Sequence, residues 1–366
     1  MPPTMKKRVL LVDDAVVVRK ALSVAIDQDP DLEVAGTAVN GRVGLAKFIS
    51  LKPDIVLLDV EMPEMNGIET VRELRKIDSR VPIIMFSSVT EQGAAVTLEA
   101  LSLGASDYVT KPSNIDMTAT LEAISHELIP KVRALCRLPE TRASVTSEVK
   151  SPVRAPALPL PPRARLLSPV QVVAIGVSTG GPDALAHVLP ALPKDFPVPV
   201  VIAQHMPPIF TSLLASRLTA KTNLPVQECV SGEPLTAGRI VIAPGDFHMV
   251  VNQENGVAML RTHQGPKENF CRQSVDVLFR SIAAVYGART LAVILTGMGQ
   301  DGVKECDAFR RLGARIFVQD EATSVVWGMP GFVARAGLAD KILPLDQIGY
   351  EIVRATTMQI AARTQA

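Results

Sequence analysis

The sequence of 366 residues is poor in aromatic residues and cysteines and carries almost no net charge. Aromatic residues make up 4%, which disfavours functions built on base stacking or aromatic cages. The formal charge of +1 at pH 7 argues against a protein that binds nucleic acid mainly through phosphate contacts. The four cysteines form no C-x-x-C pair: Cys136, Cys229, Cys271 and Cys306. A zinc ribbon or a disulfide framework is therefore disfavoured, and reduced thiols in the cytosol fit best.

Long apolar runs are absent as well. No stretch approaches the about 18 uncharged apolar residues that a membrane span needs, and residues 1–8 lack the apolar run of a signal peptide. We therefore expect a cytoplasmic protein with no direct membrane insertion and no nucleic-acid partner.

The hydrophobic content and the length of the chain support two folded domains. Hydrophobic residues make up 47%, enough to fill sizeable cores, and a domain has about 150 residues on average. Residues 139–169 hold seven prolines and neither glycine nor an aromatic residue, which favours a semi-rigid linker. A long surface loop is the alternative, but complete element patterns flank the segment on both sides. We predict domains over residues 1–138 and 170–366, joined by a linker over 139–169.

In the first domain, apolar strand-like runs alternate with amphipathic helical stretches. The predicted strands cover 8–12, 33–38, 54–58, 82–86 and 106–110, and the predicted helices cover 15–27, 41–50, 66–77, 93–103 and 116–135. Alternating strands and helices predict a five-stranded parallel sheet with helices on both faces.

The second domain repeats this alternation. Residues 170–176, 198–204, 289–295 and 315–318 are typical of buried parallel strands. The stretch 238–261 differs, because an Asn-Gly pair at 255–256 separates two strand-like runs and indicates a hairpin. The sequence thus predicts a doubly wound, mostly parallel α/β domain with a β-hairpin excursion.

Charged and hydroxyl side chains follow the predicted strands of the first domain. Ligands of parallel α/β sheets bind at the carboxyl ends of the strands, where this chain carries Asp13, Asp14, Asp59, Ser87 and Lys111. Three converging carboxylates repel one another unless a hard cation such as Mg²⁺ lies among them. A lone Asp at such a place is more often a helix N-cap, but the joint pattern favours a phosphoryl group on a carboxylate nucleophile.

These residues resemble the flavodoxin-like receiver domain of two-component response regulators over residues 6–135. The motifs are Val-Asp-Asp (12–14), Leu-Asp-Val-Glu-Met-Pro (58–63), Asn-Gly (66–67), Phe-Ser-Ser (86–88) and Thr-Lys-Pro (110–112). The resemblance implies that Asp59 is the phosphoacceptor and that Mg²⁺ binds Asp14, Asp59 and the Glu61 carbonyl, with Asp13 close by. It also implies that Ser87 and Lys111 contact the phosphoryl group and that Tyr108 is the switch aromatic.

In the second domain, Gly-Val-Ser-Thr-Gly between a strand and a helix predicts a nucleophile elbow with Ser178 at its apex. A phosphate-binding turn or a helix N-cap serine is the alternative. His205 directly follows a second strand, and Asp301 lies in a glycine-rich turn after a third. The three side chains can converge at one sheet edge as nucleophile, base and orienting carboxylate. Their chain order differs from the Ser, Asp, His order of the α/β-hydrolase fold.

This domain resembles the catalytic domain of the CheB protein-glutamate methylesterases over about 170–350. The motifs are Gly-Val-Ser-Thr-Gly-Gly-Pro (176–182), Gln-His-Met-Pro-Pro (204–208), Ile-Ala-Pro-Gly-Asp-Phe-His-Met (242–249), Ser-Val-Asp (274–276), Leu-Thr-Gly-Met-Gly-Gln-Asp-Gly (295–302) and Trp-Gly-Met-Pro (327–330). The resemblance implies hydrolysis of glutamyl methyl esters on chemoreceptors and deamidation of receptor glutamines, without a cofactor for the esterase reaction. Backbone N–H groups of Met298, Thr179 and Gly180 would stabilise the oxyanion.

The resemblance also implies control by a chemotaxis histidine kinase, whose phosphoryl group would relieve a block of the esterase cleft by the receiver. An esterase or amidase acting on another protein is one alternative. A binding module with a vestigial triad is another. A DNA-binding output is disfavoured, because no helix-turn-helix or basic patch follows the linker.

Overall fold

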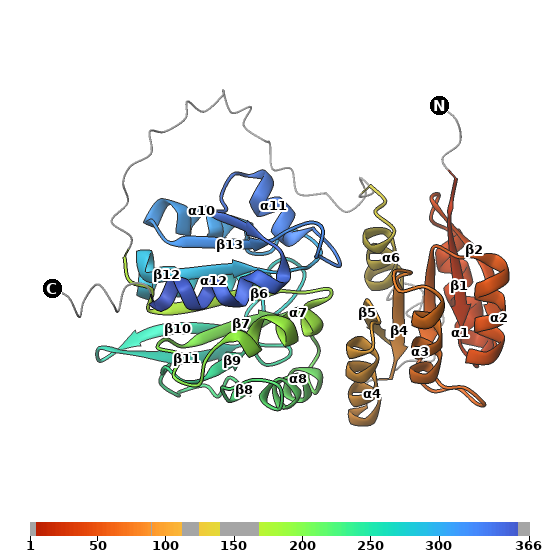
Figure 1. Cartoon of the computed structure of the whole chain (residues 1–366), viewed down its shortest axis with the longest axis horizontal. Helices are drawn as coiled ribbons and strands as arrows, with labels where there is room; N and C mark the ends of the chain where they lie inside the picture. Colours follow the sequence, from red (N-terminus) through yellow and green to blue (C-terminus); the bar gives the residue numbers. More distant parts are fainter. Residues whose placement is uncertain (1–4, 89, 112–123, 140–167, 358–366) are drawn as a thin grey trace, which may run out of the picture.

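The structure of the protein is a computed structural model that describes residues 5–88, 90–111, 124–139 and 168–357. Two α/β units lie side by side (Figure 1). Most of the predicted linker, residues 140–167, and the start of the predicted helix 116–135 fall outside the described residues. Among the described helices, none is long and apolar enough to cross a membrane.

The first unit contains the predicted five-stranded parallel sheet, in the order β2-β1-β3-β4-β5. Its strands are β1 (Lys7–Val12), β2 (Leu32–Ala38), β3 (Ile55–Asp59), β4 (Ile83–Ser87) and β5 (Asp107–Thr110). Its helices are α1 (Val16–Asp27), α2 (Gly41–Leu51), α3 (Gly67–Ile77), α4 (Glu91–Ser102) and α6 (Ile129–Leu135), the last preceded by a π-helical turn (Ile124–Leu128). Every residue of β3 and β4 is buried, as expected of central strands covered on both faces.

The second unit is built on a seven-stranded sheet in the order β14-β13-β12-β6-β7-β9-β8, and all its pairs are parallel. The strands are β6 (Val172–Val177), β7 (Val200–Gln204), β8 (Val226–Glu228), β9 (Ile240–Ile242), β12 (Thr290–Ile294), β13 (Arg315–Gln319) and β14 (Lys341–Leu343). The helices are α7 (Gly181–Val188), α8 (Phe210–Thr219), α9 (Val275–Tyr286), α10 (Val303–Leu312), α11 (Met329–Arg335) and α12 (Leu345–Thr357), with 3₁₀ turns at Leu189–Ala191 and Gly287–Arg289. The mostly parallel α/β fold is confirmed.

The predicted hairpin is present, but its bounds were wrong. Strands β10 (His248–Glu254) and β11 (Val257–His263) pair in antiparallel fashion around a turn at Asn255 and Gly256. The predicted stretch 238–261 also contained β9, which pairs in parallel with β7 and β8 in the main sheet. A buried strand of three residues has too short a pattern to be separated from the hairpin that follows.

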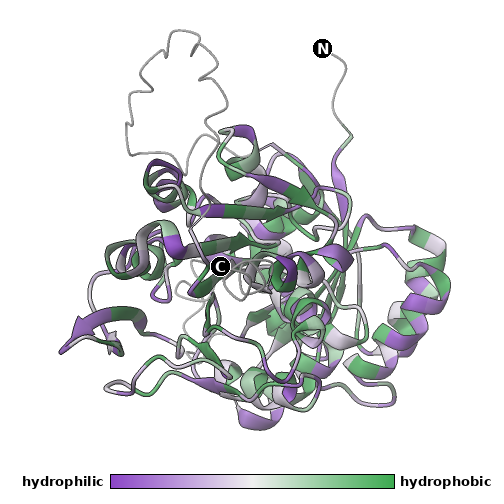
Figure 2. Ribbon diagram, turned by 60° about the vertical axis from the view of Figure 1, so that its left-hand side comes forward, coloured by the Kyte–Doolittle hydropathy of each residue, from purple (hydrophilic) through white to green (hydrophobic). Residues whose placement is uncertain are grey.

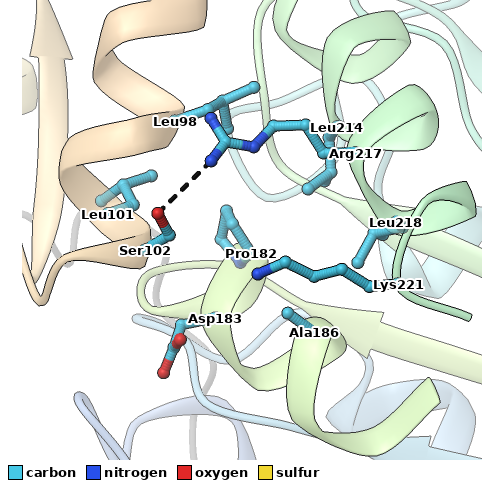
Figure 3. A pocket seen from close by; sticks show the side chains of 10 residues that line it. All are labelled: Leu98, Leu101, Ser102, Pro182, Asp183, Ala186, Leu214, Arg217, Leu218 and Lys221. Carbon is cyan, nitrogen blue, oxygen red and sulfur yellow. Dashed lines mark hydrogen bonds between the residues drawn. The ribbon is translucent and has the colours of Figure 1, made fainter. Parts of the chain in front are cut away.

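The two units pack against each other through α4 of the first and α7 and α8 of the second. Figure 3 shows Leu98, Leu101 and Ser102 of α4 facing the side chains of the second unit across a small pocket. Arg217 on α8 donates hydrogen bonds across this boundary to the Ala95 carbonyl and to the Ser102 hydroxyl, both at 3.3 Å. Hydropathy follows the layering, because the sheet strands are largely hydrophobic and the helices carry hydrophilic residues as well (Figure 2).

Candidate functional sites

The side chains of Ser178, His205 and Asp301 come together at the carboxyl ends of β6, β7 and β12. His205 Nδ1 lies 3.2 Å from Ser178 Oγ, and His205 Nε2 lies 2.8 Å from Asp301 Oδ2. The three predicted residues therefore form one chain of contacts from hydroxyl to imidazole to carboxylate. Ser178 and His205 are half-buried and Asp301 is buried. This arrangement suits activation of a serine oxygen by a neighbouring base.

Asp301 is held by the start of α9. Its Oδ1 accepts hydrogen bonds from Asn269 Nδ2 at 2.6 Å, from Ser274 Oγ at 2.9 Å and from the Asp276 N–H at 3.0 Å. Its Oδ2 accepts one from the Val275 N–H at 2.7 Å, besides its contact with His205. Burial raises the pKa of Asp301, but the hydrogen bond and charge of His205, followed by the N–H groups of Asp276 and Val275, outweigh burial, so the pKa is lowered.

Cys271 is an unpredicted neighbour of the imidazole. One ligand atom each of His205, Cys271 and Asp301 lie within 4.8 Å of one another. Burial disfavours the charged imidazole, but Cys271 and Asp301 outweigh this effect and raise the pKa of His205 above its ordinary value. His205 is therefore a strong base in this environment.

The turn that carries Ser178 depends on glycine. Gly180 has a φ of 78°, and the Gly181 N–H donates to the Ser178 carbonyl at 2.8 Å. A Cβ on Gly181 would collide with Oε1 of Gln204. Gln204 in turn donates from Nε2 to the carbonyls of Ser178 and His205, each at 3.1 Å. This buried side chain joins the serine turn to the histidine turn.

A second buried amide supports the histidine turn from the other side. Gln273 accepts from the Met206 N–H at 2.9 Å and donates to the Met206 carbonyl at 2.7 Å. Within the described residues, the N–H groups of Thr179, Gly180 and Met298 donate to no protein atom. These free donors lie on the turns that carry Ser178 and Asp301.

In the first unit, Lys111 reaches two carboxylates. Its Nζ lies 2.7 Å from Asp59 Oδ1 and 3.3 Å from Asp13 Oδ2. Both carboxylates are buried, and apart from the ion pair of Asp13 with Lys111, Oδ2 of each has no hydrogen-bond partner among the described residues. Burial, and after it the charge of Asp13, raises the pKa of Asp59 to about 6 although Lys111 acts in the opposite direction.

Oxygen atoms of Asp13, Asp14 and Asp59 lie within 4.8 Å of one another, and Asp14 is exposed. Buried carboxylate oxygens without donors are the ligands that Mg²⁺ prefers, so these residues fit a magnesium ion. The Glu61 N–H lies 3.4 Å from Asp59 Oδ1, and its side chain is exposed.

The Lys111 N–H donates to the Ser87 carbonyl at 2.6 Å, but no described hydrogen bond joins the Ser87 hydroxyl to the Asp59 carboxylate or to the Lys111 ammonium group. This buried hydroxyl donates to the Gly93 carbonyl at 3.2 Å and accepts from Thr97 Oγ1 at 2.7 Å. Both partners belong to α4, the helix that packs on the second unit. The Ser87 hydroxyl thus connects the end of β4 to the boundary between the units.

Two further contacts join the units beside Ser178. The Tyr108 ring stacks on the Phe210 ring with centroids 4.7 Å apart, and Thr179 Oγ1 donates to Asp107 Oδ2 at 2.8 Å. Lys131 lies over Tyr108 and also faces Asp107, at 3.2 Å. Val326 of the second unit joins an apolar cluster made mainly of first-unit residues, and the half-buried Met298 packs against this cluster. Residues next to the candidate nucleophile are therefore part of the boundary.

Fold and sites together define a receiver-type unit joined to an α/β unit with a serine, histidine and aspartate arrangement. The response regulator receiver domain family matches residues 9–122, and the CheB methylesterase family matches residues 173–352. The chain belongs to the CheB methylesterase family, and a receiver domain precedes its methylesterase domain.

Relatives and a solved structure agree with this assignment. A protein-glutamate methylesterase/protein-glutamine glutaminase of Trichodesmium erythraeum is 45% identical over 95% of this chain and 99% of its own length. A protein of the same description from a Nocardioides species is 47% identical over 96% of both chains. The crystal structure of the Thermotoga maritima CheB methylesterase catalytic domain is 41% identical, with a TM-score of 0.50, and covers 51% of this chain and 99% of that one.

Proposed function

We propose that this protein is a phosphorylation-activated serine hydrolase that removes methyl esters from chemoreceptor glutamates and deamidates specific receptor glutamines in chemotaxis. The observation that carries the proposal is the contact of His205 with both Ser178 Oγ and Asp301. Two curated relatives that match nearly the whole chain bear the names of both activities.

Ser178, His205 and Asp301 would carry the chemistry. With its proton on Nε2 and facing Asp301, His205 accepts the Ser178 proton on Nδ1 while Oγ attacks the glutamyl carbonyl carbon. The same proton then passes to the methoxy oxygen, so methanol leaves and an acyl-enzyme remains. Water activated by His205 cleaves that ester and restores Ser178. Deamidation follows the same steps with ammonia as the leaving group.

The unpartnered N–H groups of Thr179, Gly180 and Met298 are the proposed oxyanion donors. Charge develops on the carbonyl oxygen when Oγ attacks, and donors fixed in advance stabilise it without reorganisation. Their place on the turns of Ser178 and Asp301 supports this role. No cofactor is needed for this sequence of steps.

In the receiver, Asp59 is the proposed phosphoacceptor for a chemotaxis histidine kinase. The carboxylates of Asp13, Asp14 and Asp59, with the Glu61 carbonyl, would hold Mg²⁺, which neutralises negative charge around a bound phosphoryl group. Lys111 already contacts Asp59 and would pair with the phosphoryl oxygens. Ser87 would turn its hydroxyl from α4 toward that group.

Phosphorylation would weaken the contacts that hold the receiver on the esterase. A turn of Ser87 releases its bonds to Gly93 and Thr97 on α4, and Tyr108 is the proposed switch aromatic. Both α4 and Tyr108 contact the second unit beside Ser178. A local charge change would thereby shift an equilibrium between covered and open arrangements.

The domain division fits this scheme, with a receiver over residues 1–138, a linker over 139–169 and the catalytic domain over 170–366. We propose a cytoplasmic enzyme whose partners are its kinase and the cytoplasmic parts of methylated chemoreceptors, without nucleic acid and without membrane insertion.

Incubation with methyl-labelled receptor membranes, with and without a small phosphodonor, tests the proposal. We expect methanol release that rises with phosphodonor, and loss of release in Ser178→Ala with an unchanged unfolding temperature. Near-normal turnover by Ser178→Ala would remove Ser178 as the nucleophile. Hydrolysis of other acyl substrates alone would favour a different esterase, and no turnover would favour a binding module.

A further inference from the structure

Phe270 lies beside the catalytic residues in an exposed and strained position. Phe270 is 90% exposed, and its φ is 67°. A phenylalanine at positive φ is uncommon, because Cβ then crowds the neighbouring backbone. Nothing in the described part of the chain packs on this ring. Strained residues of this kind concentrate at sites that bind ligands.

The turn itself does not call for a large residue. Glu268 and Cys271 exchange two backbone hydrogen bonds, at 3.1 Å and 3.2 Å, around Asn269 with φ 51° and Phe270. The hairpin between β10 and β11 turns through Asn255 and Gly256, with φ 48° and 83°. Both turns place two consecutive residues at positive φ, where Asn-Gly is favoured. The fold alone would favour glycine at position 270.

The residues on either side of Phe270 contact the triad. Asn269 donates to Asp301 at 2.6 Å, and Cys271 lies within 4.8 Å of His205 and Asp301. The turn is also fixed from outside, because Glu268 forms a two-pronged ion pair with Arg280. Phe270 therefore stands at the edge of the reacting centre on a rigid support, unlike a loose surface residue.

We propose that Phe270 is a substrate-binding residue that packs on an apolar side chain of the polypeptide next to its esterified glutamate. This inference rests on the proposed function, because it names the substrate side of the same site. The occupant is the substrate chain itself, since the residues on both sides of Phe270 lie at the triad and Phe270 stays exposed while the receiver is docked. A small ester without neighbouring residues lacks the apolar side chain on which the ring would pack.

The test compares Phe270→Gly with the wild type on two substrates, with phosphodonor present. One is a methylated cytoplasmic receptor fragment, and the other is N-acetylglutamate γ-methyl ester. We expect KM for the fragment to rise about tenfold or more, the loss expected for one buried phenyl ring. The kcat/KM for the small ester should stay within about twofold, and the unfolding temperature should not fall, because glycine relieves the strain.

Phe270→Asn is a second variant that removes the ring, with a residue that tolerates positive φ. Phe270→Trp keeps an aromatic ring and should have the wild-type KM for the receptor fragment. Tyr350→Ala on α12 is the matched control, since that aromatic side chain is 71% exposed and lies outside the site loops. An unchanged fragment KM in both truncations overturns the inference alone. Equal losses on both substrates also overturn it. A wild type that hydrolyses no receptor ester overturns the proposed function together with it.

Discussion

The rings of Tyr108 and Phe210 stack nearly parallel, with an interplanar angle of 7°, across the boundary between the receiver and the catalytic domain. Tyr108 lies within β5, three residues before Lys111, and Phe210 begins the helix that follows the His205 turn. Such a pair contributes about 0.5–1.5 kcal/mol beyond the area that it buries. One contact thus links the strand that leads to the proposed phosphorylation site with the helix that follows the proposed catalytic base.

Weakening this stack should raise basal activity. Phe210→Leu keeps an apolar side chain at a buried position but removes the ring. We expect methanol release without phosphodonor to rise several-fold and the stimulation by phosphodonor to shrink, because the covered arrangement loses stability. Unfolding temperature monitors the fold. Unchanged basal and stimulated rates in a folded variant would show that the stack does not restrain the enzyme.

Arg217 permits the same test with little risk to the core, because its hydrogen bonds to the Ala95 carbonyl and to the Ser102 hydroxyl are exposed. Figure 3 shows the bond to Ser102. Arg217→Ala should raise the basal rate by a smaller factor than Phe210→Leu, since exposed polar contacts contribute little. Lys221→Ala is the control, because Lys221 lines the same pocket and no described hydrogen bond of its side chain crosses the boundary. Equal basal rates in Arg217→Ala and Lys221→Ala would contradict the proposed role of the Arg217 hydrogen bonds in holding the receiver on the catalytic domain.

The pH dependence of hydrolysis should respond to Cys271. His205 acts as a base only when it is neutral, so kcat/KM should rise with pH through its pKa. Burial lowers that pKa, while Cys271 and Asp301 raise it and prevail. Cys271→Ser removes one raising influence, so the acid limb of the profile should move to lower pH. Cys136→Ser in the receiver is the control. An acid limb that Cys271→Ser leaves at the same pH would refute the influence of Cys271 on the pKa of His205.

Asp59→Asn should stabilise the receiver at neutral pH when Mg²⁺ is absent. The pKa of Asp59 is raised to about 6, so the folded state holds its proton more tightly than the unfolded state. Stability therefore falls as pH rises from the ordinary carboxyl pKa through about 6, and asparagine avoids this loss. We expect a gain of about 3 kcal/mol, since the pKa of Asp59 lies about two units above its ordinary value and each unit corresponds to about 1.4 kcal/mol.

Thermal unfolding at several pH values checks this expectation. The gain should vanish in acid, where wild-type Asp59 is protonated as well. Mg²⁺ should stabilise the wild type more than Asp59→Asn, and phosphodonor should stimulate only the wild type. A variant that is less stable at neutral pH, or equally stimulated, would count against the proposed phosphoacceptor site.

Gln204 should act as a positioning residue. Its amide joins the carbonyls of Ser178 and His205, while its buried Oε1 has no hydrogen bond. Gln204→Leu should lower kcat about 10- to 100-fold with little change in KM, because small shifts between nucleophile and base are costly. Gln171→Leu, at an exposed position before β6, is the control. A KM effect without a kcat effect would assign Gln204 to substrate binding instead.

Much of the fold could be predicted because its central strands are continuous apolar runs that end on polar residues. Asp59 ends β3 and Gln204 ends β7, so the sheet edge was visible in the pattern. The strands β8, β9 and β14 could not be predicted, because three residues are too few to show the alternation of a strand. Residues 116–123 and 140–167 lie outside the described part of the chain.

The site shows a similar division. Ser178, His205 and Asp301 could be selected because each follows an apolar strand, and the structure brings their side chains together. Asn269, Cys271 and Gln273 were missed, because their places depend on turns in which ordinary residues adopt positive φ. The polar Gln204 at the end of an apolar strand was an available signal. The bonds of Ser87 to α4 depend on a rotamer, which no sequence pattern reveals.

Thr179 belongs to both halves of the enzyme. Its side chain is bonded to Asp107 of the receiver, while its main chain offers an N–H group on the Ser178 turn. Selection therefore cannot adjust the strength of the domain contact at this position without also disturbing the geometry of the nucleophile. A substitution of Thr179 therefore affects both catalysis and the contact between the domains. Arg217 and Phe210 are positions at which the strength of the domain contact can change without altering the Ser178 turn.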